Sequence, residues 1–309
     1  MEFYTNILNA IGNTPLLELV RLSDVPIFAK AEYMNPGGSI KDRVALYLIE
    51  EAEKDGSLKP GMTIMEATSG NTGIGVTLVG VHKGYRVVNI MPEDMSEERK
   101  KIIRAFGGEL VFTPAKKSIA GSLEKLREMA GGDPNVFVPD QFNNPRNPEI
   151  HYLTTAREIW RQMEGRVDAF VAGVGSGGTL GGVGRFLKEQ NSDIEVAAVE
   201  PANAAALLGH EPGLHMIQGI GDGFVPAVLD TSLIDDVITV TDNDAIWTAR
   251  ALAAKEGALT GTSSGANVWA ALKLSKQLGR GKNVVTVLPD RAERYFSTAL
   301  IKGDGMYEA

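Results

Sequence analysis

The sequence predicts an α/β protein with mainly parallel sheets. Short apolar runs of strand length alternate with amphipathic stretches of helical periodicity along the chain, which is the pattern of a parallel sheet with helices on its faces. Turns rich in Gly, Ser and Thr stand between several of the strands and the helices that follow them. The length of 309 residues is enough for about two domains.

Turn residues separate the expected elements in the first half of the chain. The turn Gly12-Asn13-Thr14-Pro15 precedes a short apolar run, and Ser39 is a suitable helix N-cap after a proline–glycine turn. Asp94 and Glu97 have the spacing of a capping box. We expect strands at 16–19, 27–32, 63–66, 85–91, 109–113 and 135–139, and helices at 40–54, 74–81, 94–104 and 118–129.

The second half continues the same alternation. Its longest expected helix is amphipathic and covers 148–163, and the Gly- and Pro-rich stretch 202–234 is interpreted as a lid or cleft lining. Asp242 is the expected cap of a later helix. We expect strands at 169–174, 195–200, 236–241 and 283–289, and further helices at 179–189, 243–256 and 265–278. A domain boundary is expected near 143–150, where Asn and Pro are frequent.

Composition excludes several classes of function. The chain has 43% hydrophobic and 23% charged residues, a net charge of −8 and no cysteine, so nucleic-acid binding, disulfides and thiolate metal sites are not expected. The histidines are 82, 151, 210 and 215, and no two have the spacing of a zinc pair on one helical face. The longest apolar run, 74–81, is too short to cross a bilayer, and the N-terminus has no signal-peptide pattern. We expect a cytoplasmic protein without a metal site.

Lys41 stands in an unusual place for a structural lysine. It follows the turn Pro36-Gly37-Gly38 and falls in the first turn of the expected helix. The positive end of the helix dipole disfavours an ammonium group there and makes the neutral amine easier to form. A neutral amine is the nucleophile that forms a Schiff base with a carbonyl. Alone, such a position is more often that of a solvated surface residue.

Three turns rich in Gly, Ser and Thr each open a helix. They cover 68–73, 175–179 and 261–265. Ligands of open α/β sheets bind at the carboxyl ends of strands, and a helix N-terminus behind a glycine turn offers free N–H groups to an anion. The turns therefore predict a site for a phosphate or a carboxylate.

A dinucleotide site is the alternative from another class. Residues 173–178 contain a Gly-x-Gly-x-x-Gly spacing, and Glu200 lies where a ribose-binding acid is expected. An NAD-dependent oxidoreductase would leave Lys41 and the other two turns without a role. No P-loop and no nucleophile elbow occurs in the sequence.

Several motifs together resemble one known family. They are Gly12-Asn13-Thr14-Pro15-Leu16, Asn35-Pro36-Gly37-Gly38-Ser39-Ile40-Lys41-Asp42-Arg43, Thr68-Ser69-Gly70-Asn71-Thr72-Gly73, Gln141-Phe142 with Asn144-Pro145, Gly175-Ser176-Gly177-Gly178-Thr179, Gln218-Gly219-Ile220-Gly221 and Gly261-Thr262-Ser263-Ser264-Gly265. They resemble the cysteine synthase (O-acetylserine sulfhydrylase) family, which is the β-replacement branch of the fold type II pyridoxal-phosphate enzymes. The match runs in order from about residue 5 to 300.

The resemblance implies a role for each matching residue. Lys41 would hold pyridoxal 5'-phosphate as a Schiff base, Asn71 would contact the ring hydroxyl and Ser263 the ring nitrogen. A neutral hydroxyl at that nitrogen permits elimination while disfavouring prolonged carbanion chemistry. The cofactor phosphate would be held by Gly175, Ser176, Gly177, Gly178 and Thr179. The substrate carboxylate would be held by Thr68, Ser69, Gly70, Thr72 and Gln141.

The resemblance also implies an architecture. It implies two doubly wound domains with the cofactor in the cleft between them. A smaller, mobile domain of 40–147 would close over the substrate, and a larger domain of 1–39 plus 148–309 would hold the cofactor phosphate. A homodimer is implied as well.

The implied reaction replaces the β-substituent of a serine-type amino acid. O-acetyl-L-serine and sulfide, or thiosulfate, would give L-cysteine, or S-sulfocysteine, and acetate through an aminoacrylate intermediate, with Lys41 as the base. Cystathionine- or lanthionine-forming chemistry, or sulfide release, on serine or cysteine is the alternative within the family. A family-like binding protein without catalysis is a third hypothesis, against which the intact Lys41 argues.

Some positions depart from the family pattern. Ser176 replaces a common Thr but keeps the hydroxyl, and Thr262 precedes Ser263 where an apolar residue or Gly is usual. Asp140 and Asp290-Arg291 resemble the B-type cysteine synthases, which also accept thiosulfate. Asp222 stands where a small residue is usual, and a carboxylate near the mouth would favour an amine-bearing second substrate over a bare anion. Met216 replaces a Lys in a region associated with serine acetyltransferase docking, which argues against that partner.

Overall fold

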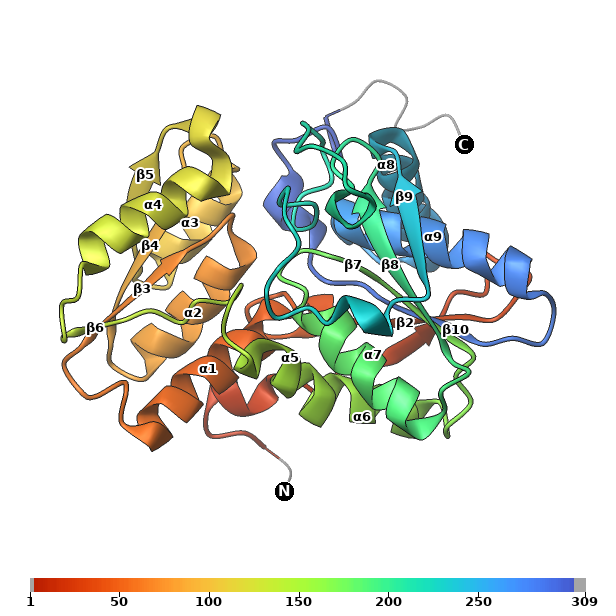
Figure 1. Cartoon of the computed structure of the whole chain (residues 1–309), viewed down its shortest axis with the longest axis horizontal. Coiled ribbons are helices and arrows are strands. Elements are labelled where there is room, and N and C mark those ends of the chain that lie inside the picture. The colour runs from red at the N-terminus through yellow and green to blue at the C-terminus, as the bar shows by residue number, and fades with distance from the viewer. Residues whose placement is uncertain (1–2, 303–309) are drawn as a thin grey trace.

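The computed structural model describes residues 3–302 and contains two sheets with helices on both faces (Figure 1). The α/β prediction is therefore confirmed. The larger sheet has the order β1 (Leu16–Glu18), β2 (Ile27–Lys30), β10 (Val284–Val287), β7 (Ala169–Gly173), β8 (Glu195–Pro201) and β9 (Asp236–Val240). The smaller sheet has the order β5 (Glu109–Thr113), β4 (Arg86–Pro92), β3 (Thr63–Ala67) and β6 (Val136–Phe137). Among the named strands, only β1 and β2 pair antiparallel.

The smaller sheet is covered on both faces because its strands alternate between two cores. In β3, Ile64 packs with residues of α1 (Lys41–Asp55) and α2 (Asn71–His82). The next residue, Met65, packs with Leu126 of α4 (Ser118–Ala130) on the opposite face. Both residues are buried, as a parallel strand with helices on both sides requires.

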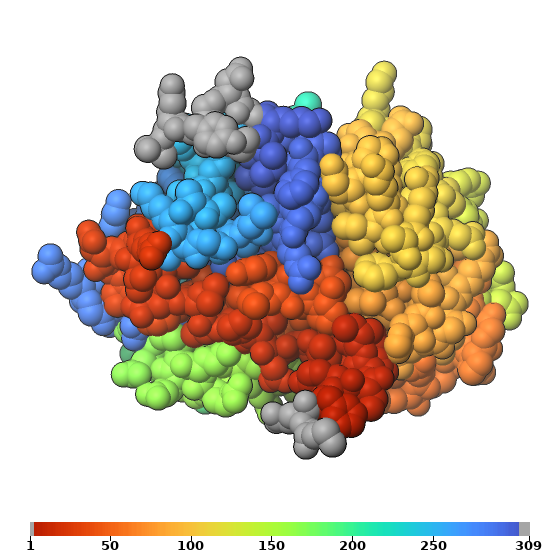
Figure 2. Space-filling model, turned by 180° about the vertical axis from the view of Figure 1, so that it is seen from behind, coloured from red at the N-terminus to blue at the C-terminus, as the bar shows by residue number. Residues whose placement is uncertain are grey.

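The larger sheet is likewise covered by helices on both faces. Ala169 of β7 joins a core with α8 (Asp242–Ala251) and α9 (Thr262–Leu278), whereas Phe170 joins a core with α6 (Ala156–Gln162) and α7 (Gly178–Gln190). In Figure 1 the two sheets form separate lobes, with α1, α5 (Arg146–Ile150) and α6 along their common base. Figure 2 shows from behind that the N-terminal segment, in red, crosses the larger lobe between its blue and green parts and reaches the orange lobe.

Three helix N-caps differ from their prediction, and α2 and α9 each begin three residues before the predicted 74 and 265. The capping box at Asp94 is wrong: α3 (Glu97–Ala105) begins after Ser96, whose hydroxyl donates to the Arg294 carbonyl 198 residues away instead of capping the helix. A tertiary contact has thus replaced the local cap. Helix α8 begins at Asp242, and its N-cap is Thr241, whose hydroxyl accepts the Asp244 N–H. The third difference is at α1, which begins at Lys41 with Ile40 in the cap position, while the Ser39 hydroxyl accepts the Lys41 N–H.

The long helix expected at 148–163 is present but interrupted. Residues His151–Thr155 form a π-helical turn between α5 and α6. This turn buries His151, whose Nδ1 pairs with the Thr155 hydroxyl at 2.9 Å. Burial lowers the pKa of His151, so it is neutral at physiological pH. Within residues 3–302 no helix is long and apolar enough to cross a membrane, and no group of acidic and histidine side chains could hold a metal ion.

Candidate active site

Four helices begin at the wall of one cavity between the lobes. Their first turns contribute Lys41 from α1, Asn71 from α2, Thr179 from α7 and Ser263 from α9. Each helix N-terminus carries partial positive charge and free N–H groups. Their convergence makes the cavity suited to an anionic ligand with more than one acceptor group.

The Lys41 side chain reaches the glycine turn at 175–179. Its Nζ donates to the Ser176 hydroxyl at 2.9 Å. Burial lowers the pKa of Lys41 to about 8, while Asp222 and Glu66 oppose that shift. A substantial fraction of the amine is therefore neutral near pH 8, as a nucleophilic lysine requires.

The three glycines of the turn at 175–179 leave its backbone uncovered. Gly177 has φ +78°, and a Cβ at Gly175 or Gly178 would collide with the Gly219 carbonyl or with the Asn147 amide. Asn147 in turn donates from Nδ2 to the Ser176 hydroxyl at 2.9 Å and to the Gln141 carbonyl at 2.7 Å. The backbone at the start of α7 thus stays bare, as phosphate binding at a helix N-terminus requires.

Asn71 faces the cavity with one amide atom free. Its Nδ2 donates to the Asp290 carboxylate at 2.6 Å, and its buried Oδ1 has no hydrogen-bond partner among residues 3–302. The Tyr295 hydroxyl donates to the same carboxylate at 2.5 Å. Buried polar atoms are normally hydrogen-bonded, so the free amide oxygen points to a missing polar ligand.

The turn at 68–73 is braced by its own side chains. The Thr68 hydroxyl accepts the N–H groups of Gly70 and Gly73 at 2.9 and 3.1 Å, and the Thr72 hydroxyl donates to Gln141 at 2.7 Å. Ser69 lies at the cavity wall. The result is a rigid turn with free N–H groups, and such a nest can bind a carboxylate.

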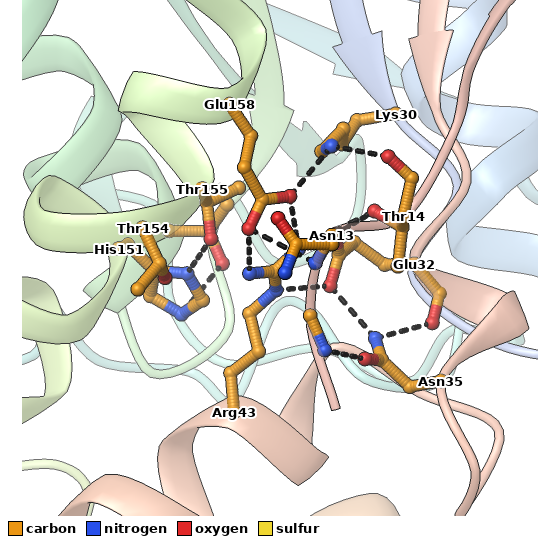
Figure 3. Close-up of polar contacts among 12 residues, drawn as sticks. Asn13, Thr14, Lys30, Glu32, Asn35, Arg43, His151, Thr154, Thr155 and Glu158 are labelled. Carbon is orange, nitrogen blue, oxygen red and sulfur yellow. Dashed lines mark hydrogen bonds and ion pairs between the residues drawn. The ribbon is translucent and has the colours of Figure 1, made fainter. Parts of the chain in front are cut away.

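A buried ionic network fixes the start of α1 (Figure 3). The Arg43 guanidinium lies between two carboxylates, 2.7 Å from Glu32 and 2.7 Å from Glu158. Lys30 pairs with Glu158 at 2.7 Å, and Glu158 also accepts the Asn13 N–H at 3.1 Å. The network ties together segments that are far apart in the sequence. Its central residue, Arg43, is two residues after Lys41 on α1, so the network fixes the position of that lysine.

Most of the predicted site residues line the cavity. They are Lys41, Ser69, Asn71, Thr72, Gln141, Gly175, Ser176, Gly177, Thr179 and Ser263. Thr68, Gly70 and Gly178 lie behind this wall, where Thr68 braces the turn and the two glycines allow close packing. Sequence reasoning missed Asn147 and Arg99, because only the folded chain brings their side chains to the site.

Glu200 does not have the geometry expected of a ribose ligand. It ends β8, and its carboxylate accepts the Leu207 N–H at 3.0 Å. It therefore stabilises the turn that follows β8. Glu200 is therefore not placed to bind a ribose, and the dinucleotide fingerprint lacks its acidic residue.

Comparison with known proteins identifies the family. The model of the family described as "Pyridoxal-phosphate dependent enzyme" matches residues 7–290. The chain belongs to this family. Among its relatives, a cysteine synthase from Staphylococcus aureus is 49% identical over 303 residues, which is 97% of each chain. The match excludes the oxidoreductase hypothesis and confirms the predicted cofactor, pyridoxal phosphate.

Solved structures agree with this assignment. The cysteine synthase of Entamoeba histolytica superimposes with a TM-score of 0.93 at 44% identity, covering 98% of this chain and 92% of that chain. The O-acetylserine dependent cystathionine beta-synthase of Helicobacter pylori gives a TM-score of 0.92 at 40% identity, covering 97% and 99%. This pyridoxal-phosphate-dependent enzyme is therefore a β-replacing member of the cysteine synthase family.

The residues present fit the cofactor. The bare turn before α7 suits its phosphate, the lowered pKa of Lys41 suits a covalent attachment, and the free Oδ1 of Asn71 suits a polar ring substituent. When bound, pyridoxal phosphate supplies an electron sink for the α-carbon of an amino acid.

Proposed function

We propose that the enzyme makes L-cysteine and acetate from O-acetyl-L-serine and sulfide, with thiosulfate as a second sulfur donor that gives S-sulfocysteine. The supporting observation is the position of Lys41, a buried amine of lowered pKa at the wall of a cavity that also holds the turn at 68–73. Lys41 can thus exchange a proton with the α-carbon of an amino acid whose carboxylate is bound in that turn.

The two glycine turns would hold the two anionic groups. Gly175 to Thr179 would take the cofactor phosphate through backbone N–H groups, and the turn at 68–72 with Gln141 would take the amino-acid carboxylate. Asn71 and Ser263 would contact the ring from the first turns of α2 and α9. Closure of a smaller domain, 40–147, over the substrate would exclude water from the reaction.

Lys41 would move the α-proton. Lys41 Nζ, as a neutral amine, would accept that proton as a general base, while the cofactor would supply the electron sink. The β-carbon then loses acetate and gains sulfur, and Lys41 returns the proton to the α-carbon. The pKa of about 8 for Lys41 suits both directions of transfer, because an acid–base catalyst is most effective with a pKa near the working pH.

Purified enzyme loaded with pyridoxal phosphate tests the proposal. We expect cysteine to form from O-acetylserine and sulfide, and Lys41→Ala to lower this rate by at least 10³-fold, within the range of a lost general base and anchor. Lys54→Ala is the matched control, since Lys54 lies on the same helix with its side chain 68% exposed. O-phosphoserine, serine and cysteine serve as competing donors. Turnover of serine without turnover of O-acetylserine would contradict the proposed donor.

We also propose a homodimer. Light scattering of the purified enzyme should give twice the mass of one 33.1 kDa chain. A monomeric mass at assay concentration would contradict it.

A further inference from the structure

Asp290 lies directly behind Asn71, on the side away from the cavity. Asp290 is 0% exposed and is not among the residues that line the cavity, although Pro289 before it is. Its carbonyl accepts the N–H of Gly261, the N-cap residue of α9, at 3.1 Å, which fixes the position of its backbone. Asp290 therefore does not touch a ligand in the cavity and acts on one only through the Asn71 amide.

A directed series of hydrogen bonds ends at the Asp290 carboxylate. It begins at Arg99, a side chain that can only donate, whose Nη2 donates to the Tyr295 hydroxyl oxygen at 2.9 Å. The guanidinium also lies over the Tyr295 ring, 4.8 Å from its centroid. Because the Tyr295 oxygen accepts from Arg99, its own hydrogen is directed at Asp290 Oδ2, 2.5 Å away. Asp290 Oδ2 is thus held as an acceptor.

This direction decides how the Asn71 amide is turned. Asp290 Oδ2 presents no hydrogen of its own, so the Asn71 atom that lies 2.6 Å from it is the donor Nδ2. The Oδ1 of Asn71 is then left for the cavity, and this buried atom has no hydrogen-bond partner among residues 3–302. The cavity is therefore offered an acceptor at this point, whereas the opposite amide orientation would offer a donor.

We infer that Asp290 is a positioning residue, which turns the Asn71 amide so that its oxygen binds the ring hydroxyl of pyridoxal phosphate in the protonated form. The inference rests on the proposed function, in which Asn71 contacts that hydroxyl. The amide oxygen accepts a hydrogen bond from O–H but repels an oxyanion, so it favours the neutral hydroxyl. The site therefore keeps the proton on this oxygen to a higher pH than a donor at the same position would.

The absorption spectrum of the loaded enzyme tests this effect, because loss of the hydroxyl proton moves the cofactor band from the ultraviolet to the visible. Asp290→Ala removes the acceptor and frees the Asn71 amide to turn Nδ2 toward the cavity. We expect the ratio of ultraviolet to visible absorbance at neutral pH to fall by about threefold or more, the effect of one neutral hydrogen bond. Asp193→Ala, at an exposed position before β8, is the matched control and should leave the ratio unchanged. An unchanged ratio in Asp290→Ala would overturn the inference.

The variant Asp290→Asn separates the orientation of Asn71 from the charge of the carboxylate. It removes the charge but keeps one oxygen. Because Arg99 obliges Tyr295 to donate, the introduced amide must turn that oxygen toward Tyr295 and Asn71. We therefore expect Asp290→Asn to keep the wild-type absorbance ratio to within about twofold. A ratio in Asp290→Asn as low as that in Asp290→Ala would show that the charge alone sets the spectrum, and would refute the positioning role.

Binding of unreactive analogues gives a readout without turnover or covalent attachment. Pyridoxine 5'-phosphate has the ring hydroxyl but no carbonyl, and its analogue with fluorine in place of that hydroxyl is nearly isosteric but donates no hydrogen bond. Calorimetric titration of the cofactor-free chain should show that wild type binds the hydroxyl compound about tenfold more tightly, and that Asp290→Ala loses most of this preference. A preference of the same size in both proteins would contradict the inference. Cysteine formation by the loaded wild type, assayed in parallel, reports separately on the proposed function.

Discussion

Replacing Arg43 by Met would remove the centre of the ionic network beside Lys41. Arg43 makes charge-assisted hydrogen bonds of 2.7–2.8 Å to both Glu32 and Glu158. Without it, Glu158 keeps its pair with Lys30. Glu32 is fully buried and keeps only neutral partners, Thr14 and Asn35. The variant therefore leaves one buried carboxylate with no cation in direct contact, although the charge of Lys30 still acts on it from nearby.

The size of the destabilisation follows from the loss of the ion pair of the buried Glu32 carboxylate. Removing one partner of a buried ion pair costs about 3–5 kcal/mol, and a domain is stable by only about 5–15 kcal/mol. We expect Arg43→Met to lose at least about a fifth of the unfolding free energy. The double variant Glu32→Gln/Arg43→Met removes the orphaned charge and should regain about 2 kcal/mol or more.

Urea unfolding of the cofactor-free protein, followed by circular dichroism, measures both variants. The same proteins are titrated with pyridoxal phosphate, and Arg43→Met should weaken its binding at least tenfold because Lys41 loses its fixed position. A loss below 1 kcal/mol in Arg43→Met, or a double variant no more stable than the single one, would refute the assigned role of the network.

Further predictions concern the glycine turn at 175–179 and two titrating groups. Gly178→Ala drives a Cβ into Asn147 and should weaken binding of pyridoxal phosphate at least tenfold, whereas Gly181→Ala, with contacts of 3.7–3.8 Å, should leave it unchanged in the same titration. Attachment of pyridoxal phosphate to the cofactor-free protein should speed up with pH, reach half its maximal rate near pH 8, the pKa of Lys41, and level off above that; a half-maximal rate only above pH 10 would contradict this. Burial raises the pKa of Glu158, but its cationic partners hold it at about 2 against an ordinary 4.5. Its contribution of about 3 kcal/mol is full above pH 4.5 and is lost toward pH 2, so the stability advantage of wild type over Glu158→Gln should shrink across that window.

The parts of the site with local signals were predictable from sequence. A glycine turn followed by a helix can be recognised from the local sequence alone. For that reason Lys41, Asn71 and the turn at 175–179 could be assigned to helix starts. The alternating pattern of short apolar runs likewise predicted the parallel sheets, because strands covered on both faces are apolar throughout.

The parts that depend on tertiary contacts were not predictable. Arg99 stands in the charged run Glu97-Glu98-Arg99-Lys100-Lys101, which indicates a solvated helix face. Packing against the segment around Tyr295, against Gln218 and against the turn at Gly70 buries it. The pairing of Arg43 with Glu158 spans 115 residues, and nothing in either local sequence identifies the partner.

Chemical trapping of the cofactor tests the central claim most directly. Borohydride reduction of the enzyme loaded with pyridoxal phosphate, followed by proteolysis and mass spectrometry, should place the pyridoxyl group on the peptide that contains Lys41. Lys41→Ala should give no labelled peptide and no yellow colour, while Lys54→Ala should give the wild-type result. A pyridoxyl group on another lysine of the wild-type enzyme, or none at all, would contradict the account.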